Sequence, residues 1–379
     1  MKKNSKRTAS IETVKKNSKE TAKVETVPAN RWGEKPKVTV GLDLGDRYSY
    51  YCMINADGEV FEEGRIQTNE EGLHRHFHGQ DRWRIALEAG AHSPWVSRKL
   101  RAWGHQAIVA NPRQIPALTE TDSRNDRNDA ENLARFAYCD PCLLKPIEHR
   151  SVERQRDLNL LKVRDTLVRA RTMMINSLRG LVKSEGQRLP KCDADNFVSR
   201  AELFIPAGLR PASQPVLEQI QQLTQHIQDL EKQIKKLAEH YPEMELLQTA
   251  QGVGPIIAAA YVLTLDRPEA FPSSRQAGAF LGLRPRQKQS GNSDVQCRIS
   301  KRGNQYLRRL LVQGAQRILG PKGEDSALRR WGLKLASTGG KRGKKRAVVA
   351  VARKLAVILH SMWKNNQPFR PFPKTAVAA

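Results

Sequence analysis

The sequence predicts an α/β domain near its N-terminus, followed by a long helical region and a second, mainly helical domain. Three apolar segments are typical of consecutive strands, at Val38–Gly45, Tyr48–Asn55 and Val60–Thr68. Helix and strand patterns then alternate up to a boundary near Pro146, as in a layered α/β domain. From Val152 onward, apolar residues recur at helical spacing.

The remaining segments complete this organisation. A short turn at residues 56–59 joins the second and third strands as a hairpin. A helix, a strand, a helix, a strand and a helix follow, at residues 72–78, 84–88, 94–103, 106–110 and 126–138. We therefore expect a disordered basic tail over 1–36, the α/β domain over 37–147, a helical and coiled-coil region over 148–245, a mainly helical domain over 246–362 and a frayed tail over 363–379.

The N-terminal tail contains a duplication. Residues 2–14 recur as residues 15–27, with ten of 13 positions identical. The repeated unit is rich in Lys, Ser, Thr and Glu and poor in large apolar residues, so we expect it to be disordered. Loose attraction to nucleic acid and a neutral duplication scar are equally compatible with this composition.

The helical region is predicted to contain two long helices. The first spans residues 152–186, and its apolar stripe comprises Leu160, Leu167, Met174, Leu178 and Leu181. The second follows Pro215, with apolar residues at the alternating spacings of a coiled-coil seam: Val216, Ile220, Leu223, Ile227, Leu230, Ile234 and Leu237. This seam either packs on the first helix as an antiparallel hairpin or pairs with another chain. The hairpin is favoured because a partner helix lies nearby in the sequence.

The charge balance points to a polyanionic partner. The chain has 65 Lys and Arg against 39 Asp and Glu, a net charge of +26, and nucleic acid is the usual polyanion for such a protein. The last acidic residue is Asp325, and 13 Lys or Arg follow it. The densest run predicts phosphate contacts, with a solvated charge run as the alternative: Lys341, Arg342, Lys344, Lys345 and Arg346.

Composition argues against a membrane protein and against a secreted disulfide scaffold. The longest apolar run, from Pro255 to Leu265, has 11 residues, whereas a membrane span needs about 20. The five cysteines are odd in number and scattered. Cys139 and Cys142 form a lone Cys-x-x-Cys, and His149 is too isolated to complete a zinc site with them. We expect a cytoplasmic protein.

Four carboxylates are placed to meet at the ends of the predicted strands. Asp43 lies near the end of the first strand and Glu88 ends the fourth, each after apolar residues where an unpaired charge is costly. Asp126 and Asp129 share one face at the start of a helix. Mg²⁺ accepts carboxylate oxygens, and two such ions about 3.5–4 Å apart can activate one oxygen and stabilise another. A helix cap with first-turn dipole partners is the simpler reading of the aspartate pair.

The C-terminal domain carries two further motifs. Gly252 and Gly254 precede a helix, and a Gly-x-Gly turn lets backbone N–H groups approach a phosphate, as in a helix-hairpin-helix element. A packing joint between helices is the alternative. Ser290, followed by Gly291, lies among basic residues that we expect to bind nucleic acid: Arg284, Arg286, Lys288, Arg298, Lys301, Arg302, Arg308 and Arg309.

Ser290 suits attack on a phosphate, because the surrounding cations would stabilise a pentavalent transition state. Taken alone the residue is weak evidence, since most loop serines make turns. Ser293 and Ser300 compete with it. Ser300 precedes Lys-Arg-Gly-Asn and is interpreted as a helix cap.

These motifs resemble the insertion-sequence-110 family of transposases over most of residues 38–360. VGLDLGD, ALEAG, NPRQI and NDRNDAENLA resemble its N-terminal DEDD domain, and GLRPRQKQSG and RISKRGNQYLRRLL resemble its C-terminal transposase domain. The resemblance implies a RuvC-like, RNase H-like fold for the first domain, with Asp43, Glu88, Asp126 and Asp129 as Mg²⁺ ligands. It makes Ser290 the expected nucleophile. Residues 292–297 depart from the family's usual Gly- and Lys-rich stretch, so Ser293 stays in competition.

The resemblance also implies a function. It predicts a DNA transposase or recombinase that excises and inserts its own element, guided by a structured RNA that pairs with donor and target DNA. The expected chemistry is Mg²⁺-assisted serine attack on DNA phosphates within a dimer or tetramer at the nucleoid. One alternative is a hydrolytic metal nuclease close to a Holliday-junction resolvase. Another is a nucleic-acid-binding protein with a decayed site.

Overall fold

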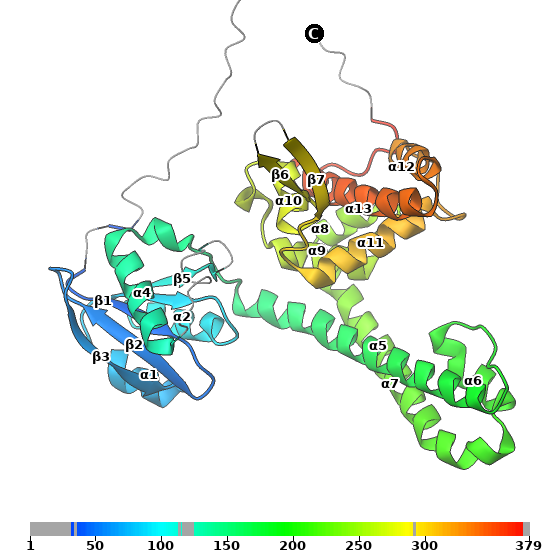
Figure 1. The fold of residues 1–379 in the computed structure, drawn as a ribbon, viewed down its shortest axis with the longest axis horizontal. Coiled ribbons are helices and arrows are strands. Elements are labelled where there is room, and N and C mark those ends of the chain that lie inside the picture. Colours follow the sequence, from blue (N-terminus) through cyan, green and yellow to red (C-terminus); the bar gives the residue numbers. More distant parts are fainter. Residues whose placement is uncertain (1–31, 34–35, 113–114, 116–124, 291–292, 374–379) are drawn as a thin grey trace, which may run out of the picture. The chain divides into compact units, whose positions relative to one another are not determined.

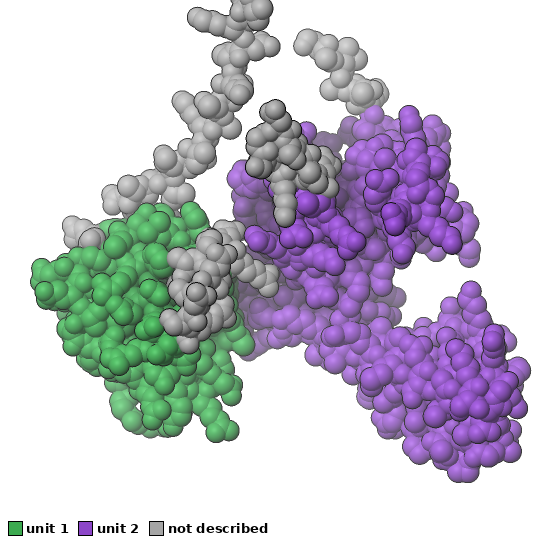
Figure 2. All heavy atoms as spheres, viewed as in Figure 1, with its two compact units in different colours: residues 1–149 green, residues 150–379 purple. Residues whose placement is uncertain are grey.

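The computed structural model describes residues 32–33, 36–112, 115, 125–290 and 293–373, with only the backbone described at 288–290 and 293–296. The chain forms two compact units, residues 1–149 and 150–379 (Figure 2). The duplicated segment of the tail lies outside the described residues. The expected disorder of residues 1–36 is wrong at Trp32, which packs against the first unit and accepts a 2.6 Å hydrogen bond from Gln106 at its carbonyl oxygen.

The first unit is built on a five-stranded sheet, and all five expected strands are present. They are β1 Thr39–Asp43, β2 Tyr48–Ile54, β3 Val60–Gln67, β4 Arg84–Glu88 and β5 Gln106–Ala110. Their order across the sheet is β3-β2-β1-β4-β5. The first three strands are antiparallel to one another, whereas β4 and β5 run parallel to β1. The carboxyl ends of β1 and β4 therefore lie at the same edge of the sheet.

Helices cover both faces of this sheet (Figure 1). Helix α4 (Asp126–Cys139) packs on one face, and α1 (Glu70–Phe77) and α2 (Ser93–Ala102) pack on the other. Successive residues of a strand point to opposite faces. Val40 and Leu42 of β1 accordingly pack with α1 and α2, which leaves Gly41 and Asp43 on the face of α4.

The histidines of α1 differ in their exposure. His76 is half-buried, and its ring lies 4.3 Å from the ring of the buried Tyr51. Burial lowers the pKa of His76 below its usual value. His74 and His78 are exposed, and their rings stack on each other at 4.2 Å.

The second unit begins with an antiparallel pair of long helices, α5 (Val152–Ser184) and α7 (Arg210–Lys236). Three contacts show that the two helices are antiparallel. As the residue number rises along the first helix, that of the contacting residue falls: Asp157 with Tyr241, Arg164 with Glu231 and Arg171 with Thr224. The favoured hairpin is therefore confirmed. Between the two helices lie α6 (Phe197–Ala201) and short 3-10 turns.

Two details of this hairpin differ from the sequence prediction. Helix α7 begins at Arg210, five residues before Pro215, so this proline lies within the first turns of the helix. The buried side chains of α5 are Leu158, Leu161, Arg171, Ile175, Leu178 and Val182. Leu181, which we assigned to the apolar stripe, is 43% exposed. The rest of the stripe is partly confirmed, because Leu178 is buried and Leu160 and Met174 pack against the core. Periodicity alone does not say which apolar residues of a helix meet a partner.

The rest of the second unit surrounds one apolar helix. It comprises α8 Glu243–Gln248, α9 Pro255–Leu265, α10 Ser274–Phe280, β6 Pro285–Ser290, β7 Ser293–Ile299, α11 Gln305–Leu319, α12 Ala327–Ser337 and α13 Gly340–Asn365. Every residue of α9 from Ile257 to Leu265 is buried. Helices α5, α7, α8 and α11 pack around it. The β6–β7 hairpin was missed because β6 is polar and only β7 alternates apolar and polar residues.

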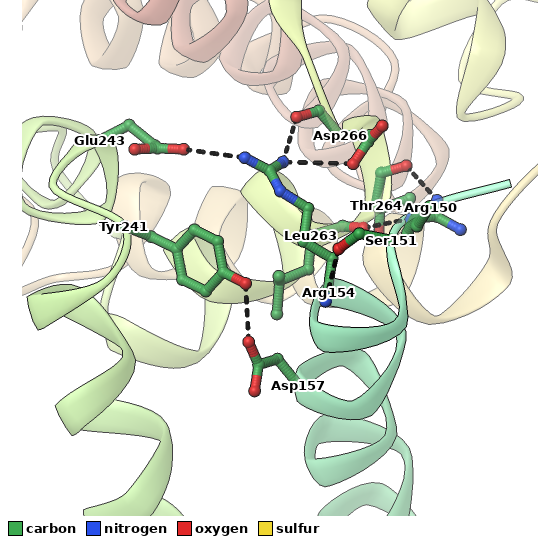
Figure 3. Close-up of polar contacts among 9 residues, drawn as sticks. All are labelled: Arg150, Ser151, Arg154, Asp157, Tyr241, Glu243, Leu263, Thr264 and Asp266. Carbon is green, nitrogen blue, oxygen red and sulfur yellow. Dashed lines mark hydrogen bonds and ion pairs between the residues drawn. The ribbon is translucent and has the colours of Figure 1, made fainter. Parts of the chain in front are cut away.

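Arginines at the start of α5 fasten the helical hairpin to this core (Figure 3). The Arg150 guanidinium donates to the carbonyl oxygens of Leu263 and Thr264, the Leu263 bond being 2.6 Å long. Arg154 contacts Asp266, which follows α9, and lies 5.2 Å from the ring centroid of Tyr241. These donors satisfy carbonyl groups that the end of a helix otherwise leaves unpaired.

The C-terminal segment is docked, and the expected fraying from residue 363 is wrong as far as Pro373. Helix α13 continues to Asn365. Beyond it, the N–H of Phe369 donates to the Thr249 hydroxyl at 2.9 Å, and the carbonyl oxygen of Pro371 accepts from Ala327 at 2.9 Å. Residues 374–379 lie outside the described residues.

Candidate active site and nucleic-acid contacts

Four carboxylates lie at the edge of the sheet where β1 and β4 end. Asp43 ends β1, Glu88 ends the neighbouring β4, and Asp126 and Asp129 lie in the first turn of α4. The charges of Asp126, Asp129 and Glu88 all act on Asp43. The strand order and the packing of α4 thus bring together the four residues that the sequence singled out.

This environment raises the pKa of Asp43. Burial raises it most, and the negative charges of Asp126, Asp129 and Glu88 raise it further, to about 6. A carboxyl group with this pKa is mostly ionised at neutral pH, at an energetic cost that a bound cation would remove. Hard carboxylate oxygens are also the donors that Mg²⁺ prefers. The donor chemistry therefore fits a divalent cation.

The described carboxylates do not by themselves form a complete set of metal ligands. Within the described ranges, no three Asp, Glu, His or Cys side chains stand close enough together to hold one metal ion. The segment 116–124, which leads into α4, lies outside those ranges. The charges of Glu88, Asp126 and Asp129 therefore act on Asp43, but the described residues do not define the individual ligands of a metal ion.

The first turn of α4 shows that the aspartate pair does not cap the helix. Asn125 is the N-cap residue, and its side-chain oxygen accepts a 3.2 Å bond from the Arg127 N–H. Asp126 and Asp129 occupy the first turn, where a negative charge is favoured by the helix dipole. Asn125, and not the aspartate pair, therefore caps this helix.

An ion pair that the sequence analysis missed ties this turn to the sheet. The Arg127 Nε donates to the Glu63 carboxylate at 2.7 Å. Glu63 pairs with Cys52 of β2, which in turn pairs with Gly41 of β1. The sequence signal for this contact was the two-residue period of β3, which puts Glu63 on one face of the strand. Predicting that this face meets Arg127 also requires the strand register, which only the structure supplies.

Ser290 is the last residue of β6, and not part of a loop as expected. It pairs directly with Ser293, the first residue of β7. The two candidate nucleophiles therefore lie opposite each other at the connected end of the hairpin, on either side of residues 291–292. Their side chains and the connecting residues 291–292 are outside the described part of the chain.

Ser300, by contrast, is excluded as the cap of α11. Asn304 is the N-cap residue, and its side chain accepts a 2.9 Å bond from the Leu307 N–H. The Ser300 hydroxyl instead accepts from the Arg302 N–H within a tight turn. The predicted role of Ser300 as a helix cap is therefore wrong.

The comparisons with known proteins agree with this arrangement. A sequence profile named as a DEDD transposase of the IS110 type matches residues 40–185, and one described as "Transposase IS116/IS110/IS902 family" matches residues 244–331. The transposase for insertion sequence element IS1111A of Coxiella burnetii is 31% identical over 294 residues, covering 76% of this chain and 79% of its own length. The chain belongs to the IS110 family of transposases.

Other relatives of this IS110-family transposase extend the match. The transposase for insertion sequence element IS1328 of Yersinia enterocolitica is 30% identical, covering 74% of this chain and 84% of its own length. A pilin gene-inverting protein of Moraxella lacunata is 24% identical, covering 88% and 98%. Family membership identifies DNA as the substrate and DNA transposition as the activity. The DEDD domain indicates the use of a divalent metal.

Two glycines of the transposase have different surroundings. A Cβ on Gly252, whose φ is +76°, would come within 2.6 Å of the Gly314 carbonyl oxygen in α11. Gly254 is the N-cap residue of α9, and no atom lies within 4 Å of the position of its Cβ. Gly252 therefore serves the packing joint, whereas Gly254 leaves the start of α9 accessible.

The predicted basic contacts of the transposase fall into two groups. Arg308 and Arg309 are engaged within the chain: Arg308 donates to the Leu281 carbonyl oxygen at 2.9 Å, and Arg309 pairs with Asp165 of α5. Burial lowers the pKa of Arg308. The other described side chains are exposed: Arg284, Arg286, Arg298, Lys301, Arg302, Lys341, Arg342, Lys344, Lys345 and Arg346. Lys288 is described only by its backbone.

Two further features of the sequence have structural explanations. His149 contacts the Ser93 hydroxyl at 2.9 Å, at the start of α2. Cys139 ends α4, and Cys142 lies in the following 3-10 turn, where its N–H donates to Asp140 at 2.8 Å.

In the described ranges, every helix is too short or too polar to cross a bilayer.

Proposed function

We propose that this transposase cleaves and rejoins DNA through a composite site. In this proposal Asp43, Glu88, Asp126 and Asp129 hold the divalent cations, and Ser290 supplies the nucleophile. The first unit then has the RNase H-like, RuvC-like fold, which its mixed sheet of order β3-β2-β1-β4-β5 supports. The observation that carries the proposal is the convergence of three other carboxylates on the half-buried Asp43.

The carboxylates would act by holding Mg²⁺, in two ions, at the scissile phosphate. When bound, such ions neutralise phosphate charge and favour the departure of the leaving oxygen. Asp43 and Glu88 are anchored by the sheet, and α4 carries Asp126 and Asp129 on one face. Ligands on helices and strands hold their positions better than ligands on loops.

Ser290 would attack the phosphate directly, from the same chain or from a neighbouring protomer. Its Oγ gives up its proton and forms a bond to phosphorus, one bridging P–O bond of the DNA breaks, and the leaving DNA oxygen takes up a proton to become a hydroxyl. The covalent phosphoserine link retains the energy of the broken bond, so a second DNA hydroxyl can attack it to rejoin the strand. The position of Ser290 at the end of a hairpin whose described arginines are exposed supports this role.

The nucleic-acid contacts would come mainly from the exposed cations. Five of them occupy the first turns of α13, where the helix dipole is itself positive. This concentration of like charge is costly unless an anion offsets it, which supports a phosphate partner. We propose that donor DNA, target DNA and a guide RNA share these surfaces.

A dimer or tetramer is part of the proposal. The side chains of Val163, Met173 and Leu181 on α5 are 50%, 66% and 43% exposed. Large apolar side chains along one helix support an association between copies of the chain.

The test is a search for a covalent intermediate. Purified transposase, the RNA transcribed from its element's flank and labelled donor DNA are incubated with Mg²⁺, and protein–DNA adducts are separated under denaturing conditions. We expect an adduct with the wild type and with Ser293→Ala, and none with Ser290→Ala or Asp126→Ala. Ser293→Ala is the matched control, because it removes the directly paired hydroxyl.

Other outcomes would replace the proposal. Cleaved DNA without any adduct, unchanged in Ser290→Ala, would show a hydrolytic metal nuclease in which water attacks. An adduct that is lost in Ser293→Ala but kept in Ser290→Ala would transfer the role to Ser293. DNA binding without cleavage at any Mg²⁺ concentration would point to a decayed site.

A further inference from the structure

A row of paired residues leads from the candidate catalytic Asp43 to the edge of the sheet. Asp43 of β1 pairs with Tyr50 of β2, and Tyr50 pairs with Arg65 of β3. Directly paired residues point to the same face. Tyr50 packs with the cluster that includes Ala130 and Ala134 of α4. Arg65 therefore lies on the face of the four carboxylates, two strands from Asp43, or about 10 Å at the usual strand spacing.

Tyr48 lies beside Arg65 on this face. It precedes Tyr50 by two residues, so its side chain emerges on the same side. The Arg65 guanidinium lies 4.9 Å from the Tyr48 ring centroid, and the Tyr48 side chain is 44% exposed. This pair presents an aromatic ring and a cation to solvent.

The backbone around Tyr48 is held in place. A Cβ on Gly45 would overlap the Tyr48 carbonyl oxygen, so the tight turn after β1 requires glycine there. The Thr68 N–H donates to the Arg47 carbonyl oxygen at 2.9 Å and closes the same corner. The position of Tyr48 relative to Asp43 is thus set by the turn.

A groove of about 370 Å³ opens at this corner. Its lining is polar, cationic and free of carboxylates: Arg47, Tyr48, Gln67, Thr68 and Asn69. It lies at the edge of the sheet where β1 ends and β2 begins, which is the edge of the candidate catalytic site. An anionic ligand suits this lining, in contrast to the carboxylate cluster nearby.

We propose that Tyr48, Arg65 and Arg47 form a subsite for the DNA strand that adjoins the scissile phosphate. Tyr48 stacks on an unpaired base, and the two guanidinium groups contact the flanking phosphates. The distance of about 10 Å between the backbones of Asp43 and Arg65 is short enough for one DNA strand to reach both sites within a few nucleotides. Stacking is tolerant of base sequence, which suits an enzyme whose target sequence is selected by the proposed guide RNA. This subsite rests on the proposed function, since it assumes that Asp43 marks the scissile phosphate.

The experiment uses full-length transposase with its RNA and donor DNA that carries 2-aminopurine at successive positions around the element end. Anisotropy measures the affinity for DNA without Mg²⁺, and quenching of 2-aminopurine reports stacking. We expect quenching at one position within about three nucleotides of the cleavage site. Tyr48→Ala should abolish this quenching and weaken binding about tenfold, whereas Tyr48→Phe should preserve both.

Two matched controls separate a specific subsite from a general effect. Phe61→Ala removes another exposed ring from β3, at the opposite end of the strand, and should change neither signal. Arg65→Ala should weaken DNA binding, whereas Arg75→Ala, on the opposite face in α1, should not. Melting temperatures of all variants verify that they are folded.

Three results would overturn the subsite. Quenching that survives in Tyr48→Ala would show that the base stacks elsewhere. Equal losses in Phe61→Ala and Tyr48→Ala would show a diffuse surface. Weaker affinity for the RNA with unchanged affinity for DNA would assign the surface to RNA. The binding signals do not require chemistry, so failure of the serine mechanism is recognised separately by the absence of an adduct in the wild type.

Discussion

Gly41 of β1 and Ala130 of α4 are so close that one methyl group on Gly41 would overlap the Ala130 carbonyl oxygen. Asp43 follows Gly41 by two residues, and Asp126 precedes Ala130 by one helical turn. The contact therefore sets how closely the carboxylates of the strand and of the helix approach each other. The glycine of the VGLDLGD string is explained by this helix–strand packing.

Gly41→Ala should displace α4 and separate the carboxylates. Overpacking of this kind costs about 1–3 kcal/mol, and we expect a value near the upper end because the obstructing atoms belong to the backbone. Denaturant unfolding measures this loss, and DNA cleavage should fall with it. Gly180→Ala in α5 is the control, since no atom lies within 4 Å of its Cβ position and alanine favours the helix by about 1 kcal/mol. Wild-type stability and cleavage in Gly41→Ala would contradict this account.

The ion pair between Arg127 and Glu63 should act on the reaction through α4. Neither residue belongs to the four carboxylates, yet Arg127 lies next to Asp126 and its guanidinium anchors the turn to β3. Loss of residues that orient metal ligands typically reduces metal affinity or activity 10–100-fold. We expect Arg127→Ala to raise the Mg²⁺ concentration for half-maximal cleavage about tenfold, with little change at saturating Mg²⁺.

The control for this pair lies on the same helix. Arg135→Ala removes an exposed arginine that pairs with Glu131 one turn away, and it should leave the Mg²⁺ dependence unchanged. A double variant with Glu63→Gln should add little to Arg127→Ala, because both remove the same contact. Additive effects would argue against a shared positioning role.

The raised pKa of Asp43 predicts a pH dependence of stability. An aspartate with a pKa of about 6 in the folded state and 3.8 in the unfolded state destabilises the fold as pH rises through that interval, because the folded state retains the proton longer. Two pKa units correspond to about 3 kcal/mol, and partial exposure reduces this to about 1 kcal/mol. Without divalent metal, Asp43→Asn should therefore be more stable than the wild type at pH 7.5 and similar at pH 4.

Thermal unfolding in EDTA across this pH range tests the prediction. A difference of about 1 kcal/mol corresponds to about 2–4 °C for a domain of this size. Mg²⁺ should raise the melting temperature of the wild type and leave that of Asp43→Asn unchanged. A variant that is less stable than the wild type at pH 7.5 would show that the carboxylate is stabilised by contacts other than a metal.

The two glycines before α9 should separate packing from DNA binding. Gly252→Ala combines a positive φ with a clash at the Gly314 carbonyl oxygen, so it should lower the melting temperature clearly. Gly254→Ala meets no atom and should leave stability nearly unchanged. If the start of α9 binds a DNA phosphate, Gly254→Ala should weaken DNA affinity alone, as measured by anisotropy. An unchanged affinity would leave this turn with a packing role only.

Much of the first unit could be predicted because its strands are short apolar runs bounded by turns. The five strands and the helix that begins at Asp126 match the pattern of the sequence closely. The β6–β7 hairpin was missed, since β6 (PRQKQS) has no alternation of apolar and polar residues and the short alternation of Val295, Cys297 and Ile299 in β7 was overlooked. The stripe on α5 was correct at Leu178 and wrong at Leu181, because only the packing of α5 against its neighbours decides which apolar residues are buried.

The candidate site was likewise predicted only in part. The spacing of Asp126 and Asp129 identified a shared helical face, and the strand ends identified Asp43 and Glu88. Glu63, Tyr48 and Arg65 were not singled out, because their relation to Asp43 depends on the register of three strands. Register is a property of pairing between segments, and no local pattern of one strand expresses it.

The sequence by itself determined the family, the excess of positive charge and the residue types of the candidate site, since these depend on local strings and composition. Only the tertiary structure decided which carboxylates meet, which arginines are engaged within the chain and which glycines serve packing. The physical reason is that Gly41 and Ala130, or Arg308 and Leu281, become neighbours only when separate segments pack at van der Waals distance.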